Sequence, residues 1–457
     1  MTRQGGVLPA TTPPAQGLRS QPLTKDPVVR ASPTDRFLSS LKERELTGEK
    51  GWLGFGRRTA AEIVTLSPRL TDGGFSTPLA VLRDRRLRLN IATLQRWCDE
   101  RGVALAPHVK TTMSPQVAKL QLDAGAWALT VANCTQAAAV LGLGPRRLLI
   151  ANEVVDPSEL AWLARTVSHE ESPELFCYVD SIAGVELLSA SLLRYRAQLG
   201  VLIEVGAHGG RAGARSLDQV ASLARAIAAR PGLVLRGVAG FEGVLAGDRS
   251  PGALQVVRDF CVLLKSAAAL VGQARPGVSD APLVISAGGS VFFDEVAATL
   301  NLGVREGTKP LVVLRSGGYA IHDHNYLGRL SPLQGPDECL GPALEVHGRV
   351  VSMPDDSLAI VNVGKRDIGS DLGLPTVVGV ANPDWSPRSP TPRLWVEQLN
   401  DQHAYLRRDG GAVPEVLSVS DIVVFGVSHP CSTFDKWRAV PILDEDDRLV
   451  DIAHTFF

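Results

Sequence analysis

Short apolar runs and longer amphipathic stretches alternate through the middle of the chain. The apolar runs have the length of buried strands and cover 103–110, 126–132, 147–152, 175–180, 198–206, 234–240, 282–288 and 310–317. Stretches rich in alanine, leucine and arginine, such as 216–232, fill the gaps and are predicted to be helices. Apolar strands that alternate with helices are typical of a parallel sheet covered on both faces. Eight such units favour a closed (β/α)8 barrel of the TIM type. An open dinucleotide-binding sheet is less favoured, because no G-x-G-x-x-G motif with a suitably spaced acidic residue follows the first run.

The pattern changes after about Gly335. Short β-branched segments punctuated by turns, among them 343–354 and 421–430, predict a smaller and mostly antiparallel β domain. We therefore expect an α/β protein with a barrel over 70–335 and a β domain over 336–457. Residues 35–69 are expected to form a lead-in segment that could join the β domain, and residues 1–34, rich in Pro, Gly, Thr and Ser, a flexible tail.

The composition indicates which kinds of macromolecule the chain is expected to bind and in which cellular compartment it is expected to lie. Of the 457 residues, 45% are hydrophobic, enough for a sizeable core, and the formal net charge is −1. A chain without bulk charge is not expected to bind nucleic acid or an anionic membrane. Six widely scattered cysteines indicate reduced thiols. The N-terminal stretch has no apolar core of signal-peptide length, and no apolar run is long enough to span a bilayer, so we expect a soluble, cytoplasmic protein.

A lysine stands where the first barrel strand should end. The stretch ALAPHVKTTMSPQ places Lys110 between an apolar run and a turn closed by proline. The active sites of such barrels lie at the C-terminal ends of the strands. Lys110 is therefore either a surface lysine or an amine held at the barrel mouth to form a Schiff base.

Small residues close the seventh and eighth strands, at 286–290 and 315–319. Backbone N–H groups in such turns can approach an oxyanion closely, and the next helix adds the positive end of its dipole. Either segment alone could be a tight turn, but both together predict a phosphate site. Combined with Lys110, they suggest pyridoxal 5′-phosphate, whose aldehyde needs an amine to hold it. Arg211, in the glycine-rich turn after the fifth strand, is a candidate to contact the cofactor ring, with a structural ion pair as the alternative.

A second constellation lies near the C-terminus, in FGVSHPCSTFDKWR. His429 and Cys431 are two residues apart, and in an extended segment such positions point to the same side. An imidazole and a thiolate there can bind Zn²⁺ or another divalent metal and leave positions open for water and substrate. A turn with a buried thiol is the alternative. A closed structural zinc site is not expected, because the chain contains no C-x-x-C pair.

Taken together, these motifs resemble those of a known family. The stretch from Pro107 to Asn133 is similar to the first barrel units of the D-threonine aldolase and D-serine dehydratase group, which is related to alanine racemase and has the fold-type III pyridoxal-phosphate architecture. SHPCSTFDKW is similar to the metal-binding segment of that group, especially of D-serine deaminase-like amino acid deaminases. The resemblance covers roughly residues 70–457.

The resemblance implies roles for individual residues. Lys110 matches the Schiff-base lysine, and Arg211 matches an arginine near the cofactor ring. His429 and Cys431 match the metal ligands of the dehydratase branch, whereas aldolases more often have an aspartate at the second position. The implied phosphate-cradling residues are Gly288, Gly289, Ser290, Gly318 and Tyr319.

Three further positions bear on the match. His403 corresponds to a histidine common in the β domain of the group, for which we expect a structural role. Thr112 and Met113 stand where the family usually has His and Lys, which removes a basic neighbour from the surroundings of the cofactor.

Three functions are compatible with these residues. The main hypothesis is a metal-assisted dehydratase that converts a D-serine-like substrate into a 2-oxo acid and ammonia, with Lys110 as the base. The alternatives are retro-aldol cleavage of a D-3-hydroxy amino acid and a cofactor-binding protein without catalysis. The family resemblance also implies a homodimer that acts on a small D-amino acid.

Overall fold

The computed structural model describes residues 32–275, 281–301, 310–335, 338–389, 393–408, 412–413 and 416–457. Most of the expected tail, residues 1–31, lies outside this range. Its last residues belong to a helix instead: α1 (Pro33–Lys42) starts with a capping box in which the Ser32 and Asp35 side chains each accept a backbone N–H of the other residue. None of the described helices is long and apolar enough to cross a membrane.

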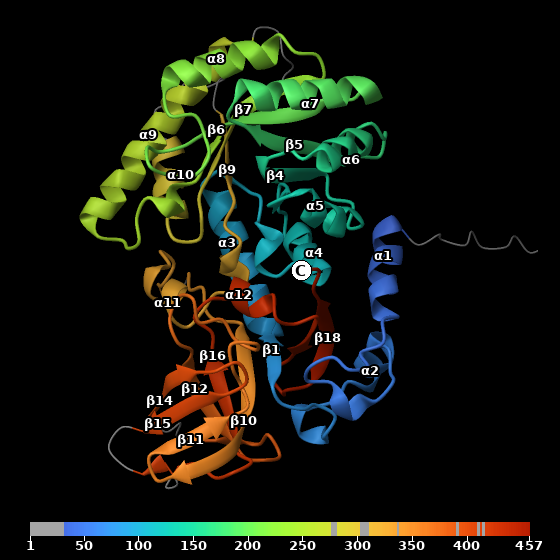
Figure 1. Ribbon diagram of the computed structural model, residues 1–457, viewed down its shortest axis with the longest axis vertical. Helices are drawn as coiled ribbons and strands as arrows, with labels where there is room; N and C mark the ends of the chain where they lie inside the picture. Colours follow the sequence, from blue (N-terminus) through green and yellow to red (C-terminus); the bar gives the residue numbers. More distant parts are fainter. Residues whose placement is uncertain are drawn as a thin grey trace, which may run out of the picture.

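Within the described residues, eight parallel strands form the upper part of the molecule (Figure 1). They are β2 (Ala104–Leu105), β3 (Leu129–Val131), β4 (Arg147–Glu153), β5 (Glu174–Val179), β6 (Leu199–Val205), β7 (Leu233–Gly240), β8 (Val284–Ala287) and β9 (Leu311–Leu314). Their order in the sheet is β2-β9-β8-β7-β6-β5-β4-β3. The edge strands meet through backbone hydrogen bonds from Trp127 N–H to the Leu105 carbonyl (2.7 Å) and from Thr130 N–H to the Pro107 carbonyl (2.9 Å). The sheet therefore closes on itself, which confirms the expected barrel.

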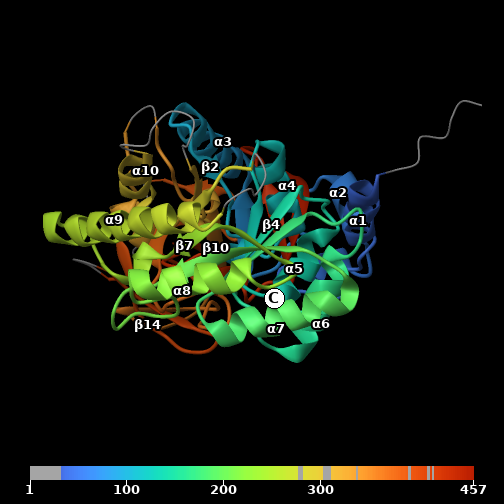
Figure 2. The ribbon, with the colours of Figure 1, turned by 90° about the horizontal axis from the view of Figure 1, so that it is seen from above.

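Helices cover the outside of the barrel (Figure 2). They are α3 (Asp84–Glu100), α4 (Pro115–Asp123), α5 (Cys134–Leu141), α6 (Pro157–Val167), α7 (Ile182–Tyr195), α8 (Leu217–Ala228), α9 (Pro251–Gln273) and α10 (Phe293–Asn301). Several begin soon after a strand, where a side chain such as that of Asn133 or Asp156 accepts the first helical N–H groups. The loops after β3, β4 and β5 are therefore short and well held, whereas longer loops follow β2, β6, β7 and β9.

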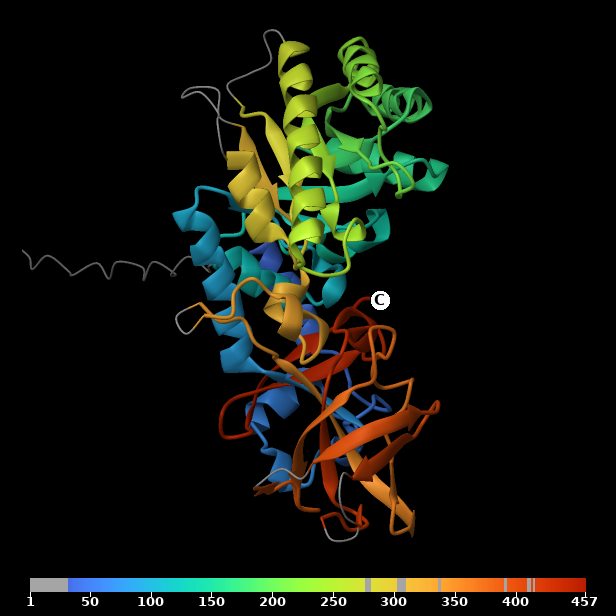
Figure 3. The same cartoon turned by 90° about the vertical axis from the view of Figure 1, so that its left-hand side faces the viewer.

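The expected antiparallel β domain is confirmed below the barrel (Figure 3). Its described strands are β1 (Leu79–Arg83), β10 (Leu344–Asp355), β11 (Leu358–Val361), β12 (Thr376–Ala381), β13 (Pro387–Arg388), β14 (Leu394–Leu399), β15 (Ala404–Arg408), β16 (Ile422–Gly426), β17 (Ala439–Leu443) and β18 (Leu449–His454). All pairs are antiparallel except β1–β17. Strand β1 thus lies in the second sheet, although 70–335 was the range expected for the barrel, and the first barrel strand begins only at Ala104.

The lead-in segment packs on the β domain. It contains the short helices η1 (Leu53–Phe55) and α2 (Ala60–Leu66), and η2 (Leu70–Asp72) follows it directly. The buried side chains of Trp52 and Ile63 belong to one apolar cluster with Ile422 and Ile452 of the β sheet. Burial of this cluster fixes the lead-in segment to the second sheet, because each large apolar side chain removed from water contributes about 1.5–3 kcal/mol.

Two short helices lie where the barrel and the β domain meet. Helix α11 (Tyr326–Leu330) follows β9 and the turn η5 (Gly318–Ala320), and α12 (Cys431–Phe434) follows β16 (Figure 1). Helix α12 contacts η3 (Val109–Thr111), the turn that follows β2. This junction brings residues far apart in the sequence to the mouth of the barrel.

Candidate active site

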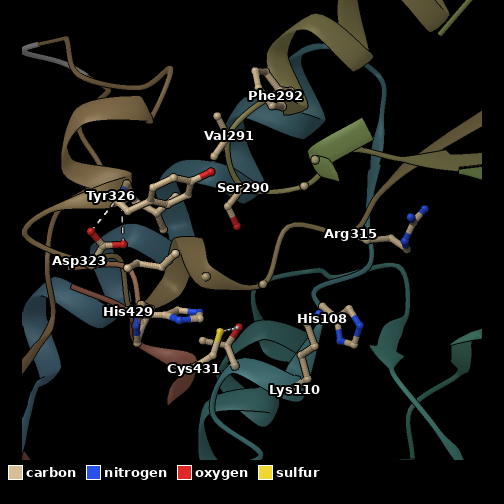
Figure 4. Close-up of a pocket in the computed structure, with 18 of the residues that line it drawn as sticks. His108, Lys110, Ser290, Val291, Phe292, Arg315, Asp323, Tyr326, His429 and Cys431 are labelled. Carbon is tan, nitrogen blue, oxygen red and sulfur yellow. Dashed lines mark hydrogen bonds between the residues drawn. The ribbon is translucent and has the colours of Figure 1, made fainter. Parts of the chain in front are cut away.

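A cavity of about 200 Å³ opens at the C-terminal ends of the barrel strands (Figure 4). Its walls come from the loops after β2, β7, β8 and β9 and from the start of α12 in the β domain. The lining residues that carry chemistry are His108, Lys110, Thr111, Glu242, Gly289, Ser290, Arg315, Gly317, Gly318, Asp323, Tyr326, His429 and Cys431.

Lys110 projects from η3 into this cavity. Burial lowers the pKa of its amine; the charge of Cys431 raises this pKa, while Arg211 and Arg315 lower it, and the net shift is downward. A lysine with a lowered pKa is neutral more often, and the neutral amine is both the nucleophile and the base. The turn that holds it is closed by hydrogen bonds from Thr112 and Met113 N–H to the Val109 carbonyl (3.1 and 2.8 Å).

The two positions that depart from the family pattern face the core. Thr112 and Met113 are both buried, and neither lines the cavity. Met113 packs in the main apolar cluster with a left-handed backbone (φ 43°), and the Thr112 hydroxyl accepts the Ser114 N–H (3.3 Å). Their effect on the cavity therefore passes through the shape of the turn that carries Lys110.

His108 lies beside Lys110 in an enclosed position. Burial lowers its pKa well below the ordinary value, and the charge of Lys110 lowers it further, so its imidazole is neutral. Its Nδ1 is buried and has no hydrogen-bond partner among the described residues. An unpaired polar nitrogen at a cavity wall is costly, and it fits a site that is completed by a bound polar ligand such as a cofactor.

Some of the residues expected to bind the phosphate already form hydrogen bonds within the protein. The fully buried Glu242, in η4 (Glu242–Val244) after β7, accepts the N–H groups of Gly288 (3.0 Å) and Gly289 (2.5 Å). The side chain of Tyr319 is also directed elsewhere, because its hydroxyl accepts Gln121 Nε2 (3.2 Å). Ser290 and Gly318 do line the cavity, together with Gly317. A Cβ on Gly317 would lie 2.3 Å from the His108 carbonyl oxygen, so only glycine allows this close approach.

We expect Glu242→Gln to lower the stability of the barrel. Glutamine offers one acceptor and turns an N–H donor toward the second amide, so the loss should be about 2–4 kcal/mol from the charged hydrogen bonds and the unpaired N–H. Thermal unfolding should show a midpoint several degrees lower. The control is Glu186→Gln, in an exposed ion pair with Arg230 (3.0 Å), which should change little. Equal midpoints for both variants would contradict this role of Glu242.

Arg211 does not line the cavity. Its side chain is 58% exposed, forms an ion pair with Glu204 (3.7 Å) and lies over the ring of Phe241. Arg315 occupies the cavity wall instead. It is buried, and its guanidinium donates to Ser286 Oγ and to the Gly240 carbonyl, both at 2.7 Å. A role of Arg211 at the cofactor ring stays a prediction and requires its side chain to leave Glu204.

His429 and Cys431 adjoin Lys110 on the β-domain side of the cavity (Figure 4). His429 Nδ1 lies 2.6 Å from Asp371 Oδ2, and Cys431 Sγ lies 3.5 Å from the Thr111 hydroxyl. A hydrogen bond to Cys431 raises the pKa of His429 to about 9, burial opposes this shift, and Asp371 adds to it. Burial alone would raise the pKa of Cys431, but His429, Thr111 and Lys110 outweigh burial and lower it.

These two side chains fit a metal site with open positions. The Asp371 carboxylate holds Nδ1 of His429, as carboxylates hold metal-binding histidines in many proteins, and this leaves Nε2 for a metal. The lowered pKa favours the thiolate, the form of cysteine that binds metal. The described residues contain no cluster of three or more potential ligands, so water and substrate would supply the remaining positions.

Sequence reasoning missed His108, Glu242, Arg315 and Asp371 as site residues. The first three follow strands β2, β7 and β9, so their position at strand ends was a usable signal. Asp371 lies in a loop before β12, and nothing in its neighbourhood marks it. His403 is exposed, lies between β14 and β15 and does not line the cavity.

Two family models match the chain. "Alanine racemase, N-terminal domain" matches residues 83–277, and "Putative serine dehydratase domain" matches residues 343–443. Among curated proteins, the chain is 26% identical to D-threonine aldolase of Arthrobacter sp over 366 residues, which cover 79% of this chain and 86% of the relative. It is 28% identical to D-threo-3-hydroxyaspartate dehydratase of Delftia sp. (strain HT23) over 303 residues, or 60% of this chain and 79% of the relative.

Solved structures share the fold. D-threonine aldolase from Filomicrobium marinum superposes with a TM-score of 0.70 at 21% identity and covers 83% of this chain and 94% of its own. The Delftia dehydratase has a TM-score of 0.69 at 23% identity, with 85% and 99% covered. Two further structures of a D-threo-3-hydroxyaspartate dehydratase carry alanine in place of a histidine and in place of a cysteine two residues later, and the cysteine variant is in the metal-free form.

Proposed function

We propose that the chain is a metal-assisted lyase of D-3-hydroxy amino acids. It joins an alanine racemase N-terminal domain to a serine dehydratase domain and belongs to the fold-type III pyridoxal-phosphate family. The reaction we favour is dehydration of a D-serine-like substrate to a 2-oxo acid and ammonia. The observation that carries this proposal is the convergence of Lys110 with His429 and Cys431 in one cavity, although some 320 residues separate them in the chain.

The residues present fit the cofactor that the family uses. Lys110 would hold pyridoxal phosphate, and Ser290, Gly317 and Gly318 would face its phosphate. When bound, the cofactor supplies an electron sink for the negative charge that develops at the α-carbon. The neutral His108 and the buried Arg315 line the same cavity and would lie near the bound cofactor.

Lys110 is the residue that moves the proton. Its amine, neutral more often because of its lowered pKa, takes the α-proton of the substrate. The side on which Lys110 stands selects the D-enantiomer, because a single base at a fixed position reaches the α-hydrogen of one configuration only.

His429 and Cys431 would hold a divalent metal, which we propose to be zinc, at the position facing the substrate hydroxyl. A metal there supplies Lewis-acid polarisation of that oxygen. The spacing of the histidine and cysteine replaced in the D-threo-3-hydroxyaspartate dehydratase variants equals that of His429 and Cys431, which supports the assignment. Asp371 orients the imidazole by holding Nδ1, which leaves Nε2 free to face the metal.

Retro-aldol cleavage is the second candidate, because aldolases are among the relatives with 26–28% identity. D-Threonine separates the two reactions. Dehydration gives 2-oxobutanoate and ammonia, whereas cleavage gives glycine and acetaldehyde. We expect the first pair of products, since Cys431 stands where the aldolase branch more often has an aspartate. Glycine and acetaldehyde as the main products would contradict dehydration.

No turnover of any D-3-hydroxy amino acid by metal-loaded holoprotein would favour cofactor binding without catalysis.

The same family relationship underlies a proposed homodimer. Analytical ultracentrifugation of the holoprotein should give twice the chain mass, and a single chain mass at micromolar concentration would contradict this part of the proposal.

A further inference from the structure

A second pocket lies at the opposite end of the barrel. It has a volume of about 850 Å³ and opens where β5, β6 and β7 begin, next to the end of α9. Strands run from this end toward the catalytic cavity, so the two sites are separated by the length of the barrel (Figure 1). Nothing in the proposed lyase reaction uses this pocket.

Positive charge gathers around it. Glu174 pairs with both Arg147 (3.0 Å) and Arg236 (2.6 Å). Arg275 lines the same pocket as Arg236, but its described hydrogen bond goes to the carbonyl of Ala281 (3.3 Å) and not to a carboxylate. The described residues of this cluster thus include three guanidinium groups and one carboxylate, and that carboxylate pairs with Arg147 and Arg236 only.

Two of these arginines also have N–H donors that form no hydrogen bond with the described residues. The Nε atoms of Arg236 and of Arg275 are both buried and have no hydrogen-bond partner among the described residues. Burial lowers the pKa of Arg275, and the charge of Arg236 lowers it further, which shows that the two cations oppose each other. Like charges with unpaired buried donors are unfavourable unless an anion joins them.

We propose that the floor of the barrel binds an oxyanion group, a phosphate or carboxylate carried by a small molecule, between Arg236 and Arg275. Guanidinium groups present paired N–H donors that match the oxygens of such anions. The volume exceeds that of a single ion and leaves room for the body of a metabolite. The apolar side chains of Leu199, Leu233 and Leu235 form the remaining wall against which that body would pack.

The test measures thermal unfolding of the holoprotein, with its cofactor site filled so that added phosphate cannot act there. Potassium phosphate and potassium succinate are each titrated against potassium chloride at equal ionic strength. We expect a saturable rise of the unfolding midpoint with at least one of the two anions. In Arg275→Gln the half-saturating concentration should increase at least tenfold, while Arg275→Lys should retain part of the effect.

Arg57→Gln is the matched control, because it removes the same charge from a side chain that is 81% exposed and lies in the lead-in segment. It should titrate like the unchanged protein. A response to phosphate alone assigns the site to phosphate esters, and a response to succinate alone assigns it to carboxylates. No rise beyond that of chloride with either anion, or equal titrations in Arg275→Gln and the unchanged protein, would overturn the proposal. If Arg275→Gln is less stable by itself, titration calorimetry at a temperature where both proteins are folded gives the same comparison.

Discussion

Replacing Lys110 by alanine should lower kcat about 10³-fold or more and abolish the visible absorbance of the bound cofactor. The loss is expected to be this large because a positioned base contributes roughly 10²–10⁴-fold, and Lys110 also provides the attachment point. Measurement needs only steady-state kinetics with D-serine and an absorbance spectrum of the purified variant.

The matched control is Lys119→Ala on the neighbouring helix α4. Lys119 pairs with Asp123 on the surface (2.6 Å) and does not line the cavity. The Lys119→Ala substitution removes the same charge as Lys110→Ala and should leave both kcat and the absorbance spectrum unchanged. An Lys110→Ala variant that keeps the absorbance band and full turnover would contradict the assignment of this lysine.

Cys431→Ala should release the metal and reduce turnover. Loss of a residue that only supports a ligand commonly weakens metal binding 10–100-fold, so loss of a direct ligand should weaken it by about 100-fold or more. Metal analysis of the dialysed protein gives the first readout, and turnover with and without added zinc gives the second. Cys339→Ala is the control, because this exposed thiol does not line the cavity.

A second substitution at the same position, Cys431→Asp, tests whether the ligand type determines which reaction occurs. A carboxylate retains a metal ligand, and the family resemblance of the sequence implies an aspartate at this position in aldolases. We expect this variant to bind metal and to form more glycine from D-threonine than the unchanged protein. Stoichiometric metal in Cys431→Ala would show that the thiol is not a ligand and would contradict the proposed site.

The barrel strands could be located from sequence because their apolar runs are continuous. Strand β5 was expected at 175–180 and lies at Glu174–Val179, and β6 was expected at 198–206 and lies at Leu199–Val205. The first strand was predicted too long, at 103–110. Its ladder with β9 ends at Leu105, and after a single bridge from His108 to Thr130 the chain enters the turn η3, which carries Lys110. A run of similar hydrophobicity thus contains both a strand and a site loop, and hydrophobicity alone does not divide them.

Sheet membership and the partners of buried charges depend on contacts between distant residues. Strand β1 looks like the start of the barrel, but it pairs with Leu344–His347, more than 260 residues later. Glu242 is similar: the segment GFEG shows an acidic residue after a strand, and only the fold shows that its carboxylate occupies the amides of Gly288 and Gly289. The phosphate role of these two glycines stays a prediction, while Lys110, Gly289, Ser290, Gly318, His429 and Cys431 all line one cavity.

The most direct test of the central claim is to find which residue carries the cofactor. Holoprotein incubated with pyridoxal phosphate is reduced with borohydride, digested and mapped by mass spectrometry, which reports a pyridoxyl group on the lysine that held it. The proposed site predicts this group on Lys110 in stoichiometric amount. A pyridoxyl group on any other lysine, or none at all, would contradict it.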